Sequence, residues 1–277
     1  MPEGPEVAIV TDWLEQRIVG YTIEKIDLHQ EWLDKVVKDK DWPHVSTNFN
    51  PLLNTTIRNV CCVCKRILMI TEELVLVSSL GMEGMWTTNP WQKNENHHQM
   101  VLSLRSPDSG KLLRLTYQNH RPIGFIFVME RAHLEAYYQE FGFDLLFETP
   151  SPAKWDQALG ELSNTAVKYI FSKDKGLTGS VGNYLRSEIL YRAKLNPHKK
   201  VKQLTPKERE TLRIVSINTI RLAYKQGGMT SNSFYSPDKV RGSFTAQVYN
   251  CTIDPHGNKV ITEAAGQTLH WVPEVQK

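Results

Sequence analysis

The chain opens with Met1-Pro2-Glu3-Gly4-Pro5-Glu6-Val7, and this stretch decides how the fold begins. Apolar residues recur at helical spacing directly after it, namely Val7, Ile9, Val10, Trp13 and Leu14. The pattern predicts a helix that begins near Pro5, because proline suits the first turn of a helix and the apolar face requires a core. Packing of that helix would hold the N-terminus in one place.

Pro2 becomes the terminal residue once Met1 is removed, which its small size permits. Its secondary amine would be partly neutral near pH 7 and therefore nucleophilic. Such an amine can attack a sugar or carbonyl carbon and form an iminium ion. Glu3 is one peptide away and can donate or accept the protons that this reaction moves. The alternative interpretation is a polar, frayed N-terminus.

Length and composition indicate a soluble protein with two domains. The 277 residues are enough for two cores, and the hydrophobic and charged fractions of 40% and 23% are ordinary. No apolar run approaches the roughly 20 residues of a membrane-spanning helix, and the start does not resemble a secretion signal. We therefore expect an intracellular protein that does not enter a membrane.

Cysteine and charge patterns are less informative. Cys61, Cys62 and Cys64 crowd into one probable strand and Cys251 is distant, so we expect free thiols rather than disulfides or a metal site. The net charge of +3 does not establish a nucleic-acid partner. The stretch from Lys194 to Lys207 is basic and has no acidic residue, which indicates either an anion-binding surface or a solvated loop.

The first half of the chain reads as β-structure. Six β-type segments separated by turn signals fall at residues 57–63, 67–70, 74–78, 100–104, 112–117 and 125–128. They predict an antiparallel β-sandwich that follows the N-terminal helix.

The second half reads as helical and follows a linker that ends at Pro150 and Pro152. Helices are predicted at 154–162, 167–171 and 183–193, and the best-marked one begins at Thr205-Pro206-Lys207-Glu208 and runs to Gly227-Gly228. Asp254-Pro255-His256-Gly257 is a hairpin turn signal between probable strands at 245–248 and 258–262. The predicted fold class is α+β, with several domains.

Four separated motifs point the same way. They are the start Met1-Pro2-Glu3-Gly4-Pro5-Glu6-Val7, the segments 79–84 (SLGMEG) and 179–190 (GSVGNYLRSEIL), and Pro273-Glu274-Val275-Gln276. In this order they resemble the formamidopyrimidine-DNA glycosylase and endonuclease VIII (Fpg/Nei) family. The resemblance implies a catalytic β-sandwich domain with an N-terminal helix at 1–130, a linker at 131–150, a helix-two-turn-helix domain at 151–244 and a β-hairpin finger at 245–277.

The resemblance also implies roles for single residues. Pro2 would be the nucleophile at the deoxyribose C1′ and Glu3 the acid that helps to open the sugar, with Lys65 on a β-hairpin that reaches the reacting nucleotide. The family's usual glycine before that lysine is Cys64 here. Three further residues would fill the gap left by the flipped base, namely Met82, Arg121 and Ile123. Met82 can alternatively be core filler.

Phosphate contacts are implied for Lys168 and Asn183, and a helix that starts at Gly182-Asn183 is a reasonable anion site on physical grounds. A solvated surface lysine is the alternative for Lys168. The finger lacks the usual cysteines, so we expect no zinc and a hairpin held by packing of Val260, Trp271, Val272 and Val275, as in zincless eukaryotic and viral relatives. Gln267 stands where the family usually has a phosphate-binding arginine.

The implied function is a bifunctional DNA glycosylase and abasic-site lyase that acts through a Schiff base on Pro2, followed by β,δ-elimination, in base excision repair. Oxidised pyrimidines are the expected substrates. Oxidised purines (formamidopyrimidine or 8-oxoguanine) are the alternative, because residues 227–244 form the long loop of the branch that caps them. A weakened damaged-DNA binder and an N-terminal-proline tautomerase remain open.

The expected partner is double-stranded DNA with oxidised bases or abasic sites. We expect a monomer that needs no cofactor and works in the nucleus or wherever the DNA lies.

Overall fold

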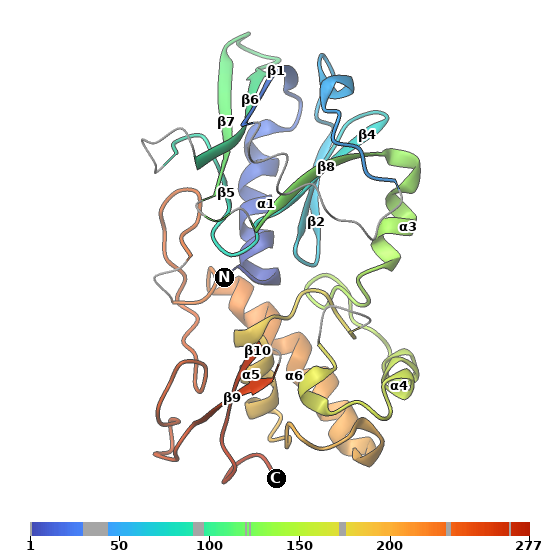
Figure 1. Cartoon of the computed structure of the whole chain (residues 1–277), viewed down its shortest axis with the longest axis vertical. Helices are drawn as coiled ribbons and strands as arrows, with labels where there is room; N and C mark the ends of the chain where they lie inside the picture. Colours follow the sequence, from blue (N-terminus) through green and yellow to red (C-terminus); the bar gives the residue numbers. More distant parts are fainter. Residues whose placement is uncertain are drawn as a thin grey trace. The chain divides into compact units, whose positions relative to one another are not determined.

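The computed structural model describes residues 2–29, 44–90, 97–119, 121, 123–171, 176–230, 234–265 and 267–277 (Figure 1). Its contacts divide the chain into two compact units. The first comprises Met1–Pro2, Glu6–Gln139 and Ser231–Arg241, and the second Glu3–Pro5, Glu140–Thr230 and Gly242–Lys277. Both units are therefore built from segments that are distant in the sequence.

The first unit contains two four-stranded antiparallel sheets and most of helix α1 (Gly4–Ile18). One sheet has the order β1-β6-β7-β5, formed by Thr22–Leu28, His98–Arg105, Leu112–Gln118 and Met85–Thr87. The other has the order β2-β3-β4-β8, formed by Asn59–Val63, Arg66–Ile70, Leu74–Ser79 and Phe125–Glu130. Its described residues also form the short helices η1 (Asn50–Leu52), η3 (Arg131–His133) and α3 (Leu134–Gln139). The predicted α+β class is confirmed.

One apolar core joins α1 to both sheets. Leu14 of α1, Leu102 of β6 and Leu76 of β4 are all within 1% of complete burial and belong to the same cluster. Phe234, from the excursion 231–241, is buried in that core as well. Each such side chain stabilises the fold by about 1.5–3 kcal/mol on burial. The predicted amphipathic N-terminal helix thus has the core that its apolar face requires.

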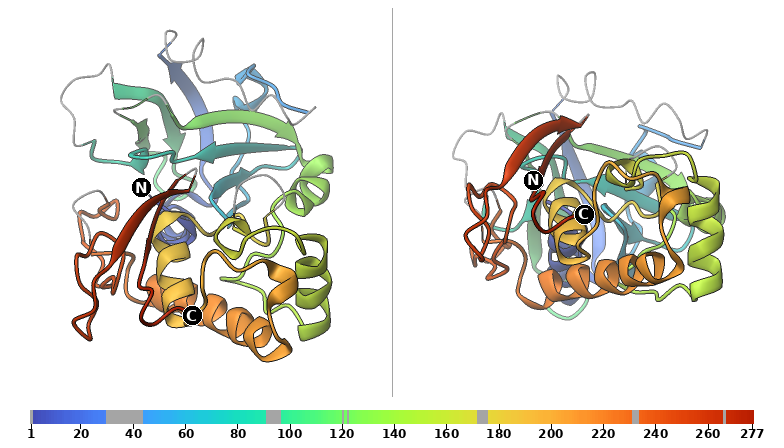
Figure 2. Two further views of the ribbon diagram at one scale, coloured as in Figure 1. Left: turned by 60° about the horizontal axis from the view of Figure 1, so that its bottom comes forward. Right: turned by 90° about the horizontal axis from the view of Figure 1, so that it is seen from below.

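The second unit is helical and carries a small hairpin. Its elements are α4 (Pro152–Glu161), η4 (Val167–Tyr169), α5 (Asn183–Arg192), η5 (Val201–Gln203), α6 (Pro206–Lys225), β9 (Ile261–Ala265) and β10 (Gln267–Trp271). Helix α6 begins as predicted, because the Thr205 hydroxyl accepts from the Glu208 N–H (3.2 Å) and the Thr205 N–H donates to the Glu208 carboxylate (2.7 Å). The two views of Figure 2 show the hairpin β9–β10 alongside α5.

The predicted finger strands at 245–248 and 258–262 are wrong in position. Asp254 does close a turn, since its Oδ1 accepts the N–H groups of His256 (2.9 Å) and Asn258 (2.8 Å). Only an isolated bridge between Ile253 and Lys259 follows from this turn, and the regular hairpin lies further on, at 261–271. The described helices include none that is long and apolar enough to cross a membrane.

Candidate active site and nucleic-acid interface

Glu3 is fixed at the N-terminal end of helix α5. Its Oε2 accepts the N–H groups of Gly182 (2.6 Å) and Leu185 (3.3 Å), and its Oε1 accepts that of Tyr184 (2.9 Å). The side chain is 1% exposed. A carboxylate suits this place because the first N–H groups of a helix have no partner within the helix and carry partial positive charge.

Gly182 makes this approach possible. A Cβ atom on Gly182 would lie 2.5 Å from the carboxyl carbon of Glu3. The next residue along the N-terminus, Gly4, is also tied down, because its N–H donates to the Ser180 carbonyl (2.9 Å). The segment that follows the buried Pro2 is therefore anchored residue by residue.

Lys65 lies in the two-residue turn that joins β2 to β3, since Val63 pairs directly with Arg66. Cys64, the first residue of this turn, has a φ of 53°, in the left-handed region that favours glycine. A non-glycine residue there costs about 1–2 kcal/mol, so the substitution for the family's usual glycine keeps the turn at some expense in stability. The lysine itself is half-buried.

Two neighbouring loops of the first unit bring Met82, Arg121 and Ile123 together. Arg121 Nη1 lies 4.0 Å from Met82 Sδ, and its Nε lies 3.6 Å from a carboxylate oxygen of Glu83. Ile123 is 55% exposed and Met82 is half-buried. That these side chains fill the gap left by a flipped base stays a prediction.

Glycines and one tyrosine hold these loops in contact. A Cβ on Gly81, whose φ is 58°, would lie 2.7 Å from the Gly124 nitrogen. The Tyr117 hydroxyl donates to the Ser79 carbonyl (2.8 Å), and burial raises the pKa of Tyr117 so that the hydroxyl keeps its proton. The sequence motif at 79–84 is thus explained by backbone contact between the loops.

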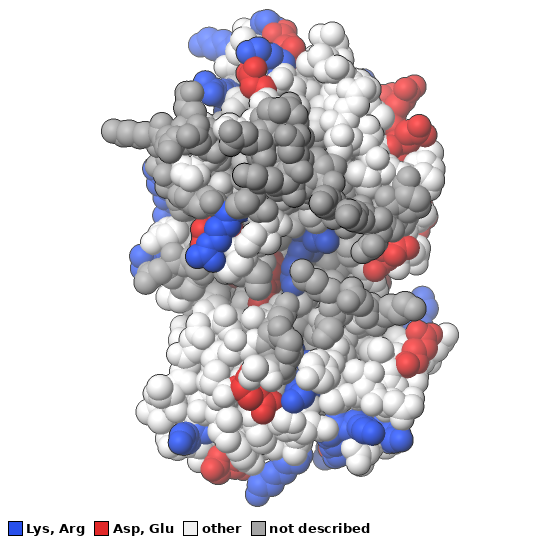
Figure 3. All heavy atoms as spheres, viewed as in Figure 1, with Lys and Arg blue, Asp and Glu red and all other residues white. Residues whose placement is uncertain are grey.

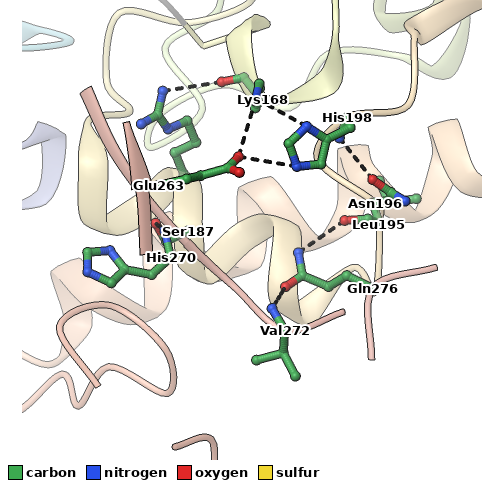
Figure 4. Close-up of polar contacts among 10 residues, drawn as sticks. Lys168, Ser187, Leu195, Asn196, His198, Glu263, His270, Val272 and Gln276 are labelled. Atoms are coloured by element: carbon green, nitrogen blue, oxygen red, sulfur yellow. Dashed lines mark hydrogen bonds and ion pairs between the residues drawn. The ribbon is translucent and has the colours of Figure 1, made fainter. Parts of the chain in front are cut away.

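Lys168 belongs to a polar network, so its alternative interpretation as a solvated surface lysine is wrong. Its side chain is 13% exposed, and its Nζ lies 3.2 Å from Glu263 Oε1 and 3.1 Å from His198 Nδ1 (Figure 4). Its role as a phosphate ligand stays a prediction, and a phosphate would have to compete with the Glu263 carboxylate.

Asn183 is the first residue of α5 and half-buried. Its Oδ1 is buried and has no hydrogen-bond partner among the described residues. The start of this helix was predicted as an anion site. The carboxylate of Glu3 occupies much of that site, because it accepts three of the N–H groups there. A phosphate contact at Asn183 also stays a prediction.

The basic stretch 194–207 is partly neutralised. Lys199 forms an ion pair with Glu208 (2.6 Å), whereas Lys202 donates to the uncharged amide of Asn164 (2.9 Å) and keeps its charge. On the face drawn in Figure 3, lysine and arginine side chains are interspersed with acidic ones. Any attraction for DNA therefore depends on local groups more than on bulk charge.

The finger is held by apolar packing, as predicted, and by polar groups that the sequence analysis missed. Val248, Val260 and Val272 form a buried cluster with Tyr191, and Val275 packs against it. Trp271, expected in that cluster, instead meets the His198 ring edge-on, with centroids 5.1 Å apart. The described residues contain no group of three or more His, Cys, Asp or Glu that could hold a metal.

Two carboxylates supply the missed polar support. Glu188 is fully buried, and its Oε1 accepts the N–H groups of residues 247–249 at 2.9–3.1 Å. The Tyr191 hydroxyl donates to Asp254 Oδ2 (3.0 Å). Glu188 was visible within the 179–190 motif, but nothing in its local sequence indicates partners some sixty residues away. Gln267 begins β10, and its backbone pairs with Ala265.

Comparisons with known proteins find similar sequences over most of the chain. Residues 1–126 match the family model described as the formamidopyrimidine-DNA glycosylase N-terminal domain. A formamidopyrimidine-DNA glycosylase of Rickettsia canadensis is 29% identical over 259 residues, covering 90% of this chain and 87% of the relative. One of Histophilus somni is 28% identical over 284 residues and covers both chains completely.

Solved structures share the fold over nearly the whole chain. The MutM (Fpg) protein of Thermus thermophilus superposes with a TM-score of 0.83 at 24% identity, covering 99% of this chain and 98% of its own. A Lactococcus lactis Fpg mutant, in complex with DNA that contains Fapy-dG, gives 0.83 at 22% identity and covers both chains completely. The chain is therefore similar to the formamidopyrimidine-DNA glycosylase N-terminal domain over residues 1–126 and to formamidopyrimidine-DNA glycosylases over most or all of its length, and it shares the fold of their solved structures.

Proposed function

We propose that this protein excises oxidised purines, formamidopyrimidines among them, from double-stranded DNA and then cuts the strand at the resulting abasic site. The observation that supports this proposal most strongly is that relatives matching 90% or more of the chain are formamidopyrimidine-DNA glycosylases. A Lactococcus lactis Fpg mutant of the same fold is solved with DNA that contains Fapy-dG. Oxidised purines, the alternative of the sequence analysis, therefore replace oxidised pyrimidines as the proposed substrates.

The excursion 231–241 supports a purine substrate. Phe234 is buried in the core of the first unit, and Asp238 accepts from Trp13 Nε1 (2.9 Å) and pairs with Arg17 (3.2 Å) on α1. Its two ends are joined by the bonds from Thr230 N–H to the Phe244 carbonyl (2.9 Å) and from Phe244 N–H to the Gly228 carbonyl (3.0 Å). A loop fixed at its base and through Phe234 and Asp238 can offer a preformed surface to a flipped base.

The chemistry follows from the N-terminal amine. The lone pair of the Pro2 nitrogen forms a bond to C1′ while the glycosidic bond breaks and the base leaves with a proton. Opening of the sugar ring gives an iminium ion, and loss of a C2′ proton expels the 3′ phosphate. A second elimination expels the 5′ phosphate. Glu3, anchored on α5 beside Pro2 in the chain, handles protons and charge at the sugar, and Lys65 assists at the nucleotide.

Cleavage of duplexes with one defined lesion tests the proposal. We expect formamidopyrimidine and 8-oxoguanine to be excised at least tenfold faster than thymine glycol or dihydrouracil. Borohydride should trap the wild-type protein on abasic DNA. Pro2→Gly should cripple base excision, and an extra residue that blocks the N-terminal amine should abolish the trapped complex. Faster excision of the pyrimidine lesions would restore the first expectation, and binding without trapping would indicate a damaged-DNA binder.

A further inference from the structure

We propose that Lys168, Arg186 and Glu263 form a clamp that fixes both strands of the β9–β10 hairpin to the helical part of the second unit. The clamp positions the hairpin for DNA, and this consequence rests on the proposed function. In this arrangement Lys168 is a positioning residue. The family resemblance gave Lys168 a phosphate, whereas the clamp gives its side chain a carboxylate within the same unit.

Strand β9 is held through Glu263. The Lys168 Nζ and the His198 Nε2 each lie 3.2 Å from Glu263 Oε1, so two nitrogens converge on one oxygen (Figure 4). The side chains of Lys168 and Glu263 are 13% and 27% exposed. Because water has limited access to both partners, their attraction is stronger than that of an ordinary surface pair.

Strand β10 is held through the backbone of the same lysine. Arg186 Nη1 donates to the Lys168 carbonyl and its Nη2 to the Thr268 carbonyl, both at 3.2 Å. Arg186 is 3% exposed. Burial lowers its pKa and the nearby Glu3 opposes this, but a guanidinium stays charged at physiological pH. The planar guanidinium thus bridges η4 and β10 from α5.

Both attachments act at adjacent positions of the hairpin. Thr268 pairs with Ala264, and Leu269 pairs with Glu263, so the two strands are held at neighbouring pairs. At the next pair, the His270 N–H donates to the Ser187 hydroxyl of α5 (3.2 Å). A two-stranded hairpin is marginal by itself. Its five-residue strands therefore take their orientation from these attachments to η4 and α5.

Charge reversal tests the clamp. The variants are Lys168→Glu, Glu263→Lys and the double swap, with Glu274→Gln as a control that removes an exposed carboxylate of the same unit. Each single reversal should accelerate amide hydrogen exchange of residues 261–271 by about tenfold, as expected for loss of a charged hydrogen bond. The double swap should recover most of the protection, and the control should match wild type.

DNA binding supplies the second readout. The probe is a duplex with one tetrahydrofuran abasic analogue, titrated at several salt concentrations. If the clamp positions the hairpin, Glu263→Gln should weaken binding several-fold and leave the salt dependence of affinity unchanged. If Glu263 instead only masks a phosphate-binding lysine, the same variant should bind more tightly with a steeper salt dependence, which would overturn the clamp.

The two proposals fail separately. Unchanged hydrogen exchange in both single reversals would overturn the clamp whatever the DNA result. A wild-type protein that does not bind the duplex would overturn the proposed function, and the exchange measurements would still decide whether the clamp exists.

Discussion

At the scale of single residues, the carboxylate of Glu3 is held in one place by the tertiary fold. The sequence places a carboxylate beside the terminal proline, and the structure fixes both of its oxygens on backbone N–H groups of α5. Chain order alone predicted the pair Pro2-Glu3. It did not predict the anchor, because the contact between residue 3 and residues 182–185 depends on the tertiary fold.

Replacing Glu3 with Gln should remove base excision while much of the cleavage at pre-formed abasic sites remains. An abasic sugar already opens to an aldehyde, so it requires less proton transfer than an intact nucleoside. The new amide would also turn a donor toward a backbone N–H, costing about 1–3 kcal/mol of unfolding free energy. Single-turnover cleavage and thermal unfolding measure these effects. Equal loss of both activities at wild-type stability would contradict the division of roles.

Asp254 gives a prediction for acid stability. Burial acts to raise its pKa, but hydrogen bonds from Asn258, Tyr191 and the His256 N–H prevail and lower it to about 2, against an ordinary 3.8. A depressed carboxyl pKa stabilises the fold above the unfolded value, and this stability is lost as the pH falls from about 4 to about 2. Asp254→Asn should be less stable at neutral pH and show a shallower acid transition. The measurement is urea unfolding across this range. An equal loss of unfolding free energy at every pH would argue against a lowered pKa of Asp254.

At the scale of elements, local signals predicted starts and turns better than pairing. The capping box at Thr205 and the turn at Asp254 were correct because each depends on residues within four positions. The hairpin strands were predicted on either side of Asp254, whereas the regular pairing lies further along the chain, in β9 and β10, where β10 contacts α5. Contacts between distant segments of this kind are not visible in the local sequence. Six of the eight strands of the two antiparallel sheets were predicted from alternation and turns, whereas β1, β5 and the strand orders were not.

The contribution of the excursion 231–241 to purine excision should depend on the hydrogen bond from the buried Trp13 indole to Asp238. Trp13 is 7% exposed, and Asp238→Ala would leave its Nε1–H without this acceptor, which costs about 1 kcal/mol. Purine excision should fall several-fold, while cleavage of abasic DNA stays near wild type. Asp238→Asn keeps an acceptor for Trp13 and is the matched control. Equal losses with both substitutions would point to the exposed Arg17 pair instead.

At the scale of the whole molecule, the family resemblance carried further than physical reading of the chain. Residues spread from Pro2 to Gln276 gave the family and its activity, whereas the supports at Arg186, Glu188 and Glu263 were found only in the structure. Each of these is a charged side chain that also contacts residues far along the chain, although Glu188 pairs in addition with Arg192 one helical turn away. Periodicity and turn chemistry do not report such pairs, because they describe neighbours in sequence.

Gln267→Arg should strengthen binding of damaged and undamaged duplex alike, because a phosphate contact adds affinity without reading the base. One further neutralised phosphate should make the slope of log affinity against log salt more negative by roughly 0.9. Fluorescence anisotropy at several salt concentrations measures the slope. An unchanged slope would show that residue 267 does not face the DNA backbone and that the alignment of residues 257–277 with the family finger is wrong.

The burial of Phe234 in the core of the first unit has a consequence for synthesis of the protein. A ribosome releases the two sheets of that unit long before it reaches residue 234, at about 5–20 residues per second. Until then the core lacks an aromatic side chain, and removing such a group from a finished core costs about 3–5 kcal/mol. We therefore expect the nascent first unit to stay accessible to chaperones and proteases until the excursion 231–241 emerges. The unit whose synthesis begins first would then complete its core only near the end of translation.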